Sequence, residues 1–190
     1  MNKKLINIAM IGLLAALSYL AFTFLQFKIP TPGGTTSFHL GNTFCVLAAL
    51  LIGGVPGGVA GAIGMGIGDL MDPVYFTSAP KTIVLKFIIG VVTGIIAHRL
   101  LHIRQKQKKT MFIDALIASA GGMLCNILLE PIWGYIYSRF FLGASSSAAS
   151  MFTNWNIITT TTNAILTVII ASCLYTAIYP KIAPILNKNQ

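Results

Sequence analysis

Two stretches of the sequence place polar side chains at helical spacing within otherwise apolar runs. In the first, an amide, a carboxylate and two rings follow at steps of four, three and four residues, so they share one helix face: Asn126, Glu130, Trp133 and Tyr137. The second repeats amides and hydroxyls at the same steps: Asn156, Thr160, Asn163 and Thr167. Rings stack and amides hydrogen-bond at fixed angles, so these faces favour a site for a flat, polar organic ligand. Alternatively, they hold helices together in a membrane, or the rings belong to an interfacial belt.

Other apolar runs carry ionisable or amide groups toward the same membrane side. Asp69 ends one run, Lys81 and Lys86 begin the next, and His39 and Asn42 open an earlier one. Ionisable groups are costly within a membrane and are therefore functional candidates there. A buried ion pair between Asp69 and Lys86 that fixes helix packing is the alternative. The predicted binding residues are thus His39, Asn42, Asp69, Lys81, Lys86, Asn126, Glu130, Trp133, Tyr137, Asn156, Thr160 and Asn163.

The sequence lacks the motifs of catalysis, metal binding and nucleotide binding. His98 and His102 stand four residues apart, as metal ligands on a helix do, but they lie in a basic run without an acid. A Gly-x-Ser at 143–145 is similar to that of intramembrane serine proteases, but no histidine follows it. The glycine-rich segment 53–68 lacks the Gly-Lys-Ser/Thr ending of a phosphate loop. We therefore expect no catalytic residue and no metal site.

The elements that must position these groups follow from composition. Of the 190 residues, 55% are hydrophobic and 9% charged, whereas a soluble domain carries about 25% charged residues. The chain is therefore predicted to be an integral membrane protein, not a nucleic-acid binder, a secreted disulfide scaffold or a disordered tail. A spanning helix needs about 20 apolar residues. This predicts an all-α fold, one domain over 1–190, with six transmembrane helices at about 5–27, 38–52, 55–71, 81–101, 111–140 and 155–178. The first run is too long for a secretory signal, so we expect it to remain uncleaved.

Small residues shape both the helices and the connections. Eight of the 18 glycines fall within 53–68, and the patterns Gly57-x-x-x-Gly61 and Gly64-x-x-x-Gly68 indicate closely packed helices. The outer segments 29–37 and 143–150 consist mainly of small residues, Pro and Gly. They suit either a lid that changes conformation or an ordinary connection.

The net charge of +9 is distributed unevenly along the chain. With the N-terminus inside, nine of the 13 basic residues fall on cytoplasmic segments: Lys3, Lys4, Arg99, Arg104, Lys106, Lys108, Lys109, Lys181 and Lys188. By the positive-inside rule, both termini are predicted to be cytoplasmic, where basic residues can meet anionic lipid or partners. If 38–52 and 55–71 form a re-entrant pair, the helix count and the orientation change.

The residues at 38–42, 50–58 and 61–70, the last reading GAIGMGIGDL, resemble the substrate-binding S components of energy-coupling factor (ECF) vitamin transporters. The segment 75–94, with Lys81 and Lys86, continues the resemblance, which is strongest to the branch with riboflavin-, pyridoxine- and hydroxymethylpyrimidine-type members. The resemblance implies a six-helix protein of the prokaryotic plasma membrane that captures a water-soluble vitamin from outside. It also implies an outer pocket formed by the first loop and the last three helices, in agreement with the polar faces above.

The resemblance further implies partners: a transmembrane coupling subunit and two cytosolic ATPases. The chain would dock onto them and topple in the membrane to release the vitamin inside. The docking motif of the family is small-x-x-x-small on the first helix, and the nearest match is Gly12 with Ala16, followed by Leu17 with Ala21. Because the chain carries no nucleotide motif, ATP is expected to be used by the partner subunits, with no cofactor in this chain. We therefore expect a transport subunit and not an enzyme.

The identity of the vitamin stays open at this point. A pyridoxine or hydroxymethylpyrimidine class is favoured, with riboflavin and cobalamin as alternatives. A different function, a small ion-coupled secondary transporter, would use Asp69 or Glu130 as a proton relay. The chain shows no clear inverted repeat, however, and its inner half is expected to be largely apolar. A purely structural or assembly subunit would bind no small molecule.

Overall fold

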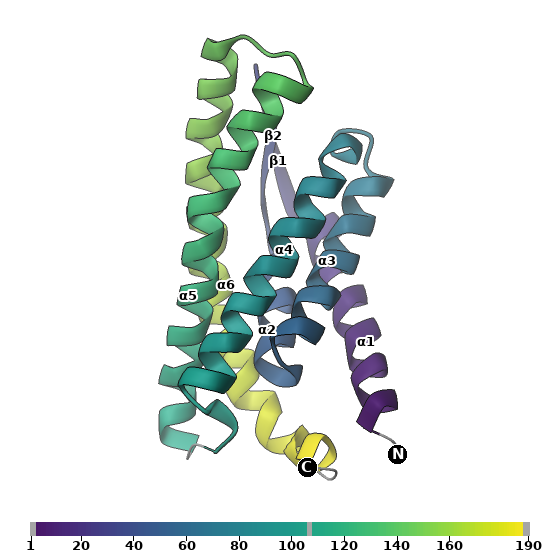
Figure 1. Cartoon of the computed structure of the whole chain (residues 1–190), viewed down its shortest axis with the longest axis vertical. Helices are drawn as coiled ribbons and strands as arrows, with labels where there is room; N and C mark the ends of the chain where they lie inside the picture. Colours follow the sequence, from purple (N-terminus) through teal and green to yellow (C-terminus); the bar gives the residue numbers. More distant parts are fainter. Residues whose placement is uncertain (1–2, 106–107, 188–190) are drawn as a thin grey trace.

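The structure, a computed structural model, describes residues 3–105 and 108–187 and is a bundle of helices with one β-hairpin (Figure 1). The main elements are α1 (Lys3–Phe24), β1 (Gln26–Thr31), β2 (Gly34–His39), α2 (Gly41–Ile52), α3 (Gly54–Met71), α4 (Ala79–Gly94), α5 (Lys108–Ile136) and α6 (Ser146–Asn187). Short helical segments adjoin them: η1 (Phe76–Ser78), η2 (Ile95–Leu100), η3 (Ile103–Gln105) and η4 (Tyr137–Phe141).

Four helical segments among the described residues are long and apolar enough to cross a membrane: Lys4–Phe24, Phe76–Leu100, Thr110–Phe141 and Ser146–Leu186. The helix α2 is apolar but shorter. At about 1.5 Å per residue its length is roughly 18 Å, less than the hydrocarbon core of a bilayer. The start of α1 and the end of α6 lie at the same end of the molecule (Figure 1). The number of six crossings and the side that this end faces remain predictions.

The short helix α2 forms the centre of the bundle. All but one of its residues, Phe44, are buried. A helix that is apolar on every face must be covered on every face, and α1, α3, α4, α5 and α6 all contact it.

The glycines of α3 set the distance to the helices around it. An added Cβ at Gly57 would lie 2.3 Å from the Cα of Ala49 in α2, and one at Gly94 in α4 would lie 2.1 Å from the Cα of Gly54. Gly64 is similarly close to α1. No side chain fits at such distances, so the prediction that this run packs helices against one another is confirmed.

The connection between α1 and α2 is a β-hairpin, so the prediction of an all-α fold with a loop at 29–37 is wrong here. β1 and β2 pair antiparallel in register from Gln26–His39 to Thr31–Gly34. Pro32 and Gly33 form the turn, and the flanking β-branched and aromatic residues favour strands. The ladder also pairs backbone groups that would otherwise be buried without partners.

The segment 143–150 is not a single loop either. Here α6 begins at Ser146 instead of at 155, and the Oγ of Ser145 accepts a hydrogen bond from the Ala148 N–H at 3.2 Å, as a helix N-cap does. α6 also continues past 178 to Asn187 and contains Pro180 and Pro184, which accounts for the bent last turns in Figure 1.

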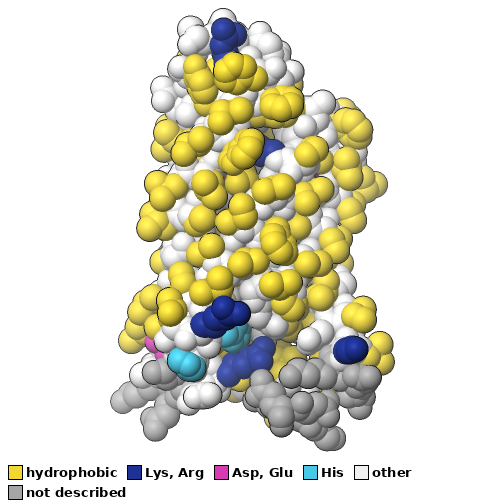
Figure 2. Space-filling view, in the orientation of Figure 1, with side chains coloured by type: hydrophobic (Ala, Val, Ile, Leu, Met, Phe, Trp, Pro, Cys, Tyr) yellow, Lys and Arg dark blue, Asp and Glu magenta, His cyan; other side chains and the backbone are white. Residues whose placement is uncertain are grey.

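Apolar side chains cover the long sides of the molecule, and Lys, Arg and His side chains gather at one end (Figure 2). We call the end with Arg99, Arg104 and Lys181 the basic end, and the end with the turn at 32–33 the hairpin end. Among the other residues predicted to lie on the cytoplasmic side, Lys106 and Lys188 lie outside the described residues, as do the side chains of Lys3, Lys108 and Lys109.

Candidate functional site

A cavity of about 70 Å³ lies beneath β2, in the half of the bundle nearer to the hairpin end. Ten of the twelve predicted binding residues line it: His39, Asn42, Asp69, Lys81, Lys86, Asn126, Glu130, Asn156, Thr160 and Asn163. They come from β2 and from α2 to α6. The fold thus brings together side chains that are as far apart in sequence as His39 and Asn163.

A network of charged groups connects α4 to α5 at one wall of the cavity. Lys81 Nζ lies 2.5 Å from Glu130 Oε1, and Lys86 Nζ lies 3.4 Å from Glu130 Oε2. Lys86 also donates a long hydrogen bond of 3.4 Å to Asn126 Oδ1. One carboxylate therefore serves two ammonium groups. The contacts of Lys86 are long, so its third donor and its charge stay available toward the cavity.

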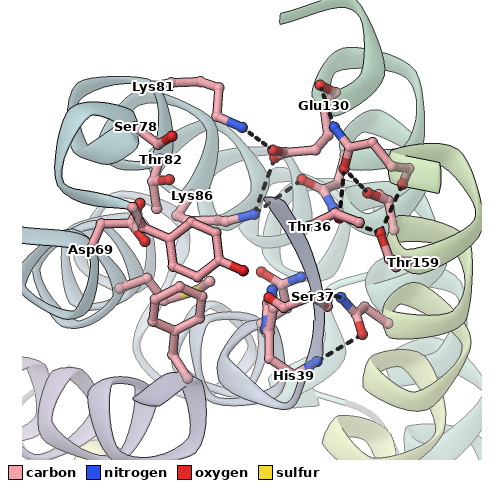
Figure 3. A pocket seen from close by; sticks show the side chains of 18 of the residues that line it. Thr36, Ser37, His39, Asp69, Ser78, Lys81, Thr82, Lys86, Glu130 and Thr159 are labelled. Atoms are coloured by element: carbon pink, nitrogen blue, oxygen red, sulfur yellow. Dashed lines mark hydrogen bonds and ion pairs between the residues drawn. The ribbon is translucent and has the colours of Figure 1, made fainter. Parts of the chain in front are cut away.

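Asp69 lies on the opposite wall, beside Thr82 (Figure 3). It is only 2% exposed, and no described Lys, Arg or His forms an ion pair with it. The alternative of a packing ion pair between Asp69 and Lys86 is therefore wrong. The reason is geometric: the ammonium of Lys86 reaches across to α5, where Glu130 and Asn126 hold it.

Asn163 and Asn156 of α6 bind neighbouring elements. Asn163 Oδ1 accepts the His39 backbone N–H at 3.0 Å, and its Nδ2 donates to the Ser37 carbonyl oxygen at 3.0 Å. Asn156 Nδ2 donates to the Glu130 carbonyl oxygen at 3.3 Å. These two amides hold β2 and α5 against α6, so the polar face of α6 serves at least partly as the helix-joining device considered above.

Other polar atoms of the cavity wall have no partner within the described chain. They include Asn42 Oδ1 and His39 Nδ1, both of which are buried. Buried polar atoms are nearly always hydrogen-bonded in proteins, so such atoms facing a cavity have capacity for a ligand or water. Tyr75, in the connection after α3, also lines the cavity, and burial raises the pKa of its hydroxyl to about 12. It therefore stays protonated and able to donate.

Trp133 and Tyr137 do not reach this cavity. They line a separate apolar groove with Pro80 and Phe141, and Trp133 is 44% exposed. The inward line of α5 continues instead from Glu130 to positions 134 and 138, which are buried. The side chains one position earlier, Trp133 and Tyr137, face the groove that Pro80 and Val84 of α4 also line.

Several residues that line the cavity are not among those predicted from the sequence. β2 contributes Thr35, Thr36 and Ser37, and the rings of Phe22 and Phe152 come from α1 and α6. The turn at Pro32 and Gly33 was an available signal for the strand. Phe152 lies four residues before Asn156, on the same face, and an earlier start of the last helix would have included it.

Gly12 and Ala16, predicted to contact a partner, are both exposed on α1. An added Cβ at Gly12 would meet no atom within 4 Å. The described part of the chain therefore leaves this small-residue face of α1 uncovered, and docking there remains a prediction.

A bundle of apolar helices that surrounds a polar cavity has the architecture of a membrane protein that binds a small molecule. The comparison with known families agrees: over residues 2–180 the chain matches the family described as ECF-type riboflavin transporter, S component, and it belongs to that family. A solved structure of ThiT from Listeria monocytogenes is similar, with a TM-score of 0.65 and 19% identity over 97% of this chain and 98% of that one. At this identity the likeness shows a common fold. No curated protein matches the sequence.

Family and fold together define the kind of protein. The chain is a multi-pass integral membrane protein and a substrate-binding transport subunit, not an enzyme. S components bind vitamin-like substrates and work with an ECF module.

Proposed function

We propose that the cavity beneath β2 binds a small, flat, polar vitamin or vitamin precursor, of the pyridoxine or hydroxymethylpyrimidine class, from the outer side of the membrane. The observation that carries this proposal is the cavity itself, in which charged, amide and hydroxyl side chains from six elements converge. In a membrane protein such groups are costly unless they serve a ligand or one another.

The size of the cavity supports a single substituted ring. Its volume of about 70 Å³ is well below the roughly 300–1,000 Å³ of most ligand pockets. A pyridine or pyrimidine ring requires only a modest outward movement of β2. Riboflavin and cobalamin are much larger and require the hairpin to move considerably further.

The chemistry of the walls supports a ring with both donors and acceptors. Asp69 and Asn42 Oδ1 offer acceptors, whereas Lys86, on the facing wall, offers donors. Hydroxymethyl, hydroxyl and amino substituents around one ring can meet both walls. The rings of Phe22 and Phe152 supply faces against which the ligand can pack.

The arrangement of Glu130 favours this function over an ion-coupled carrier. A proton relay must take up and release a proton, and Glu130 is held by Lys81 and Lys86. Protonation would disrupt both contacts. We propose instead that uptake is driven by ATP hydrolysis in two ATPase partners of a coupling subunit, which the chain contacts through Gly12 and Ala16 on α1.

Mass spectrometry of the molecule that co-purifies with the full chain tests the proposal most directly. We expect a pyridine- or pyrimidine-type vitamin, bound with nanomolar-class affinity in subsequent calorimetry. Calorimetry with pyridoxine, hydroxymethylpyrimidine, thiamine and riboflavin then ranks the classes. Failure of all four to bind, with no co-purified small molecule, would contradict the proposal.

Transport assays separate the binding subunit from a carrier. Liposomes that contain this chain alone should accumulate no vitamin, with or without a proton gradient. The variant Gly12→Leu should bind the vitamin as the wild type does. In liposomes that also contain the coupling module, the wild type should take up the vitamin and this variant should not. Uptake by the chain alone, abolished by Glu130→Gln, would instead establish an ion-coupled transporter.

A further inference from the structure

A second cavity, of about 530 Å³, opens at the basic end, far from the cavity beneath β2. It lies between the turn that joins α2 to α3 and the segments η2 and η3 that follow α4. Four basic or imidazole side chains line it: His98, Arg99, His102 and Arg104. None of the described residues that line it is acidic. The cavity is therefore a concentration of hydrogen-bond donors and positive charge.

Two of these side chains bind the C-terminal end of α2. His98 Nε2 lies 3.0 Å from the Ala49 carbonyl oxygen, and Arg104 Nη2 donates to the Leu51 carbonyl oxygen at 2.7 Å. The Ala49 carbonyl oxygen also accepts the Gly53 N–H, whereas the Leu51 carbonyl oxygen is one that the helix end leaves without a backbone partner among the described residues. Arg104 Nε nevertheless remains buried without a partner in the described chain.

The other two side chains are not used by the fold. Arg99 and His102 are exposed, and neither forms an ion pair within the described residues. Since both line the cavity, the charge of Arg99 and the N–H donors of both side chains are available to an anionic ligand.

The N-terminus of α3 opens into the same cavity. Its N-cap is Gly53, which has no side chain to accept the first free N–H groups, and Gly54 and Val55 line the cavity wall. The first N–H groups of a helix have no partner within it, and together they favour a negatively charged oxygen. Thus the backbone donors of α3 and the basic side chains favour the same kind of ligand, an anion.

Part of the cavity wall is apolar and exposed. Val55 is 59% exposed and Ile95 41%. In Figure 2 the basic and His side chains of this end directly adjoin the apolar side of the molecule. A site that combines positive charge with an exposed apolar edge matches the boundary between lipid headgroups and acyl chains.

We infer that this cavity binds the phosphate group of an anionic phospholipid, with the acyl chains along Val55 and Ile95. Arg99, His102 and the N-terminal N–H groups of α3 contact the phosphate oxygens, and Arg104 Nε adds a donor. In the predicted orientation the lipid belongs to the inner leaflet. The inference is independent of the vitamin and of the proposed function.

Native mass spectrometry of the full chain, released from nanodiscs of mixed phosphatidylglycerol and phosphatidylcholine, tests the inference. The wild type should retain phosphatidylglycerol in preference to phosphatidylcholine. The variant Arg99→Gln/His102→Gln should reduce this retention about fivefold or more, since one basic residue at a membrane surface accounts for roughly that factor. Lys181→Gln, which removes an exposed charge at the same end, should retain the lipid as the wild type does.

Several results would overturn the inference. They are equal retention by the double variant and the wild type, equal loss in Lys181→Gln, or equal retention of both lipids. Inorganic phosphate serves as the competitor: if it displaces phosphatidylglycerol completely at millimolar concentration, the site binds free anions and the lipid assignment is wrong. Vitamin affinity, measured in parallel, should be unchanged in the double variant, so this test and that of the proposed function fail separately.

Discussion

The half of the bundle near the hairpin end and the half near the basic end both bury polar side chains, but the two halves hold them in different ways. Around the cavity, polar groups bond from element to element, as Lys81 does to Glu130 and Asn163 to β2. Toward the basic end, four hydroxyls that are fully buried have no partner in the described chain: Thr93, Ser119, Thr167 and Ser172. The expectation of largely apolar packing there overlooked Thr93, Ser119 and Ser172, whereas Thr167 belonged to the predicted polar face.

Close contact, not hydrogen bonding, explains the polar residues of the half near the basic end. An added Cβ at Gly122 of α5 would lie 1.9 Å from Thr93 Oγ1 of α4. Ser and Thr act here as small side chains that let helices approach, as is common in membranes. The two halves therefore differ in how they use polar side chains. The half near the basic end is a tightly packed scaffold of helices. In the half near the hairpin end, hydrogen bonds and ion pairs join the polar groups, and a ligand can replace these bonds.

The largest effect is expected from disturbing the scaffold. In Gly94→Val, the new side chain would lie against the Gly54 backbone, since even a Cβ would be 2.1 Å from its Cα. Overpacking against backbone should destabilise the protein by about 3 kcal/mol or more. Thermal unfolding in detergent should show a large fall in the midpoint, or no folded protein.

Gly12→Val is the matched control, because an added Cβ at Gly12 meets nothing within 4 Å. It should unfold at nearly the same temperature as the wild type, apart from a small effect of the lower conformational entropy of its unfolded chain. Equal melting temperatures for the two variants would show that the scaffold is not tightly packed.

The next largest effect should come from the charged wall of the cavity. Glu130→Gln leaves Lys81 and Lys86 facing each other without an anion, although both side chains are largely buried. Removing one partner of a buried ion pair typically costs about 3–5 kcal/mol, and water in the cavity should reduce this cost. We expect a clear loss of both stability and vitamin affinity.

A second substitution identifies the cause. Lys81→Met/Glu130→Gln removes one excess cation and should recover part of the lost stability, as measured by thermal unfolding. If Glu130→Gln alone melts at the wild-type temperature, the ion pairs do not stabilise this half of the molecule.

The sequence predicts the scaffold well because its signals are local. Apolar run length and glycine spacing place α1, α3 and the combined segment of α4 and η2 within a few residues of their observed bounds. The hairpin was missed because a short strand within a Pro- and Gly-rich segment has little periodicity to detect. The contacts that hold the hairpin in place, such as those of Asn163 with β2, depend on tertiary packing.

The site is predictable to a similar degree and for a similar reason. Polar side chains are rare in apolar helices, so each one can be recognised in the sequence by itself. Ten of those predicted converge on the cavity beneath β2. Which of them pair cannot be derived from spacing alone: Lys86 binds α5 and not Asp69. The rings of α5 were misplaced because the inward positions beyond Glu130 continue at 134 and 138, one residue past each ring.

Asn163→Ala should have an intermediate effect that is specific to the cavity. The substitution removes two bonds, to the His39 N–H and the Ser37 carbonyl oxygen, that hold β2 over the cavity. Each such bond contributes about 1 kcal/mol, so vitamin affinity should fall roughly tenfold or more. Thr162→Ala, one residue away and exposed, should leave the affinity unchanged. Hydrogen exchange of the His39 amide should accelerate only in Asn163→Ala, and equal exchange in both variants would mean that Asn163 does not hold the strand.

The smallest effect is expected at Trp133, and it is informative because sequence and structure disagree there. Spacing placed this ring among the ligand contacts, whereas the fold directs it into a groove on the membrane side. Trp133→Ala should therefore change vitamin affinity by less than about twofold, while Phe152→Ala, which removes a ring of the cavity wall, should weaken binding by about 1–3 kcal/mol. Calorimetry on the two variants decides the matter. A loss at Trp133 as large as at Phe152 would mean that the ligand extends between α4 and α5, past Lys81, and that the polar end is open toward the membrane.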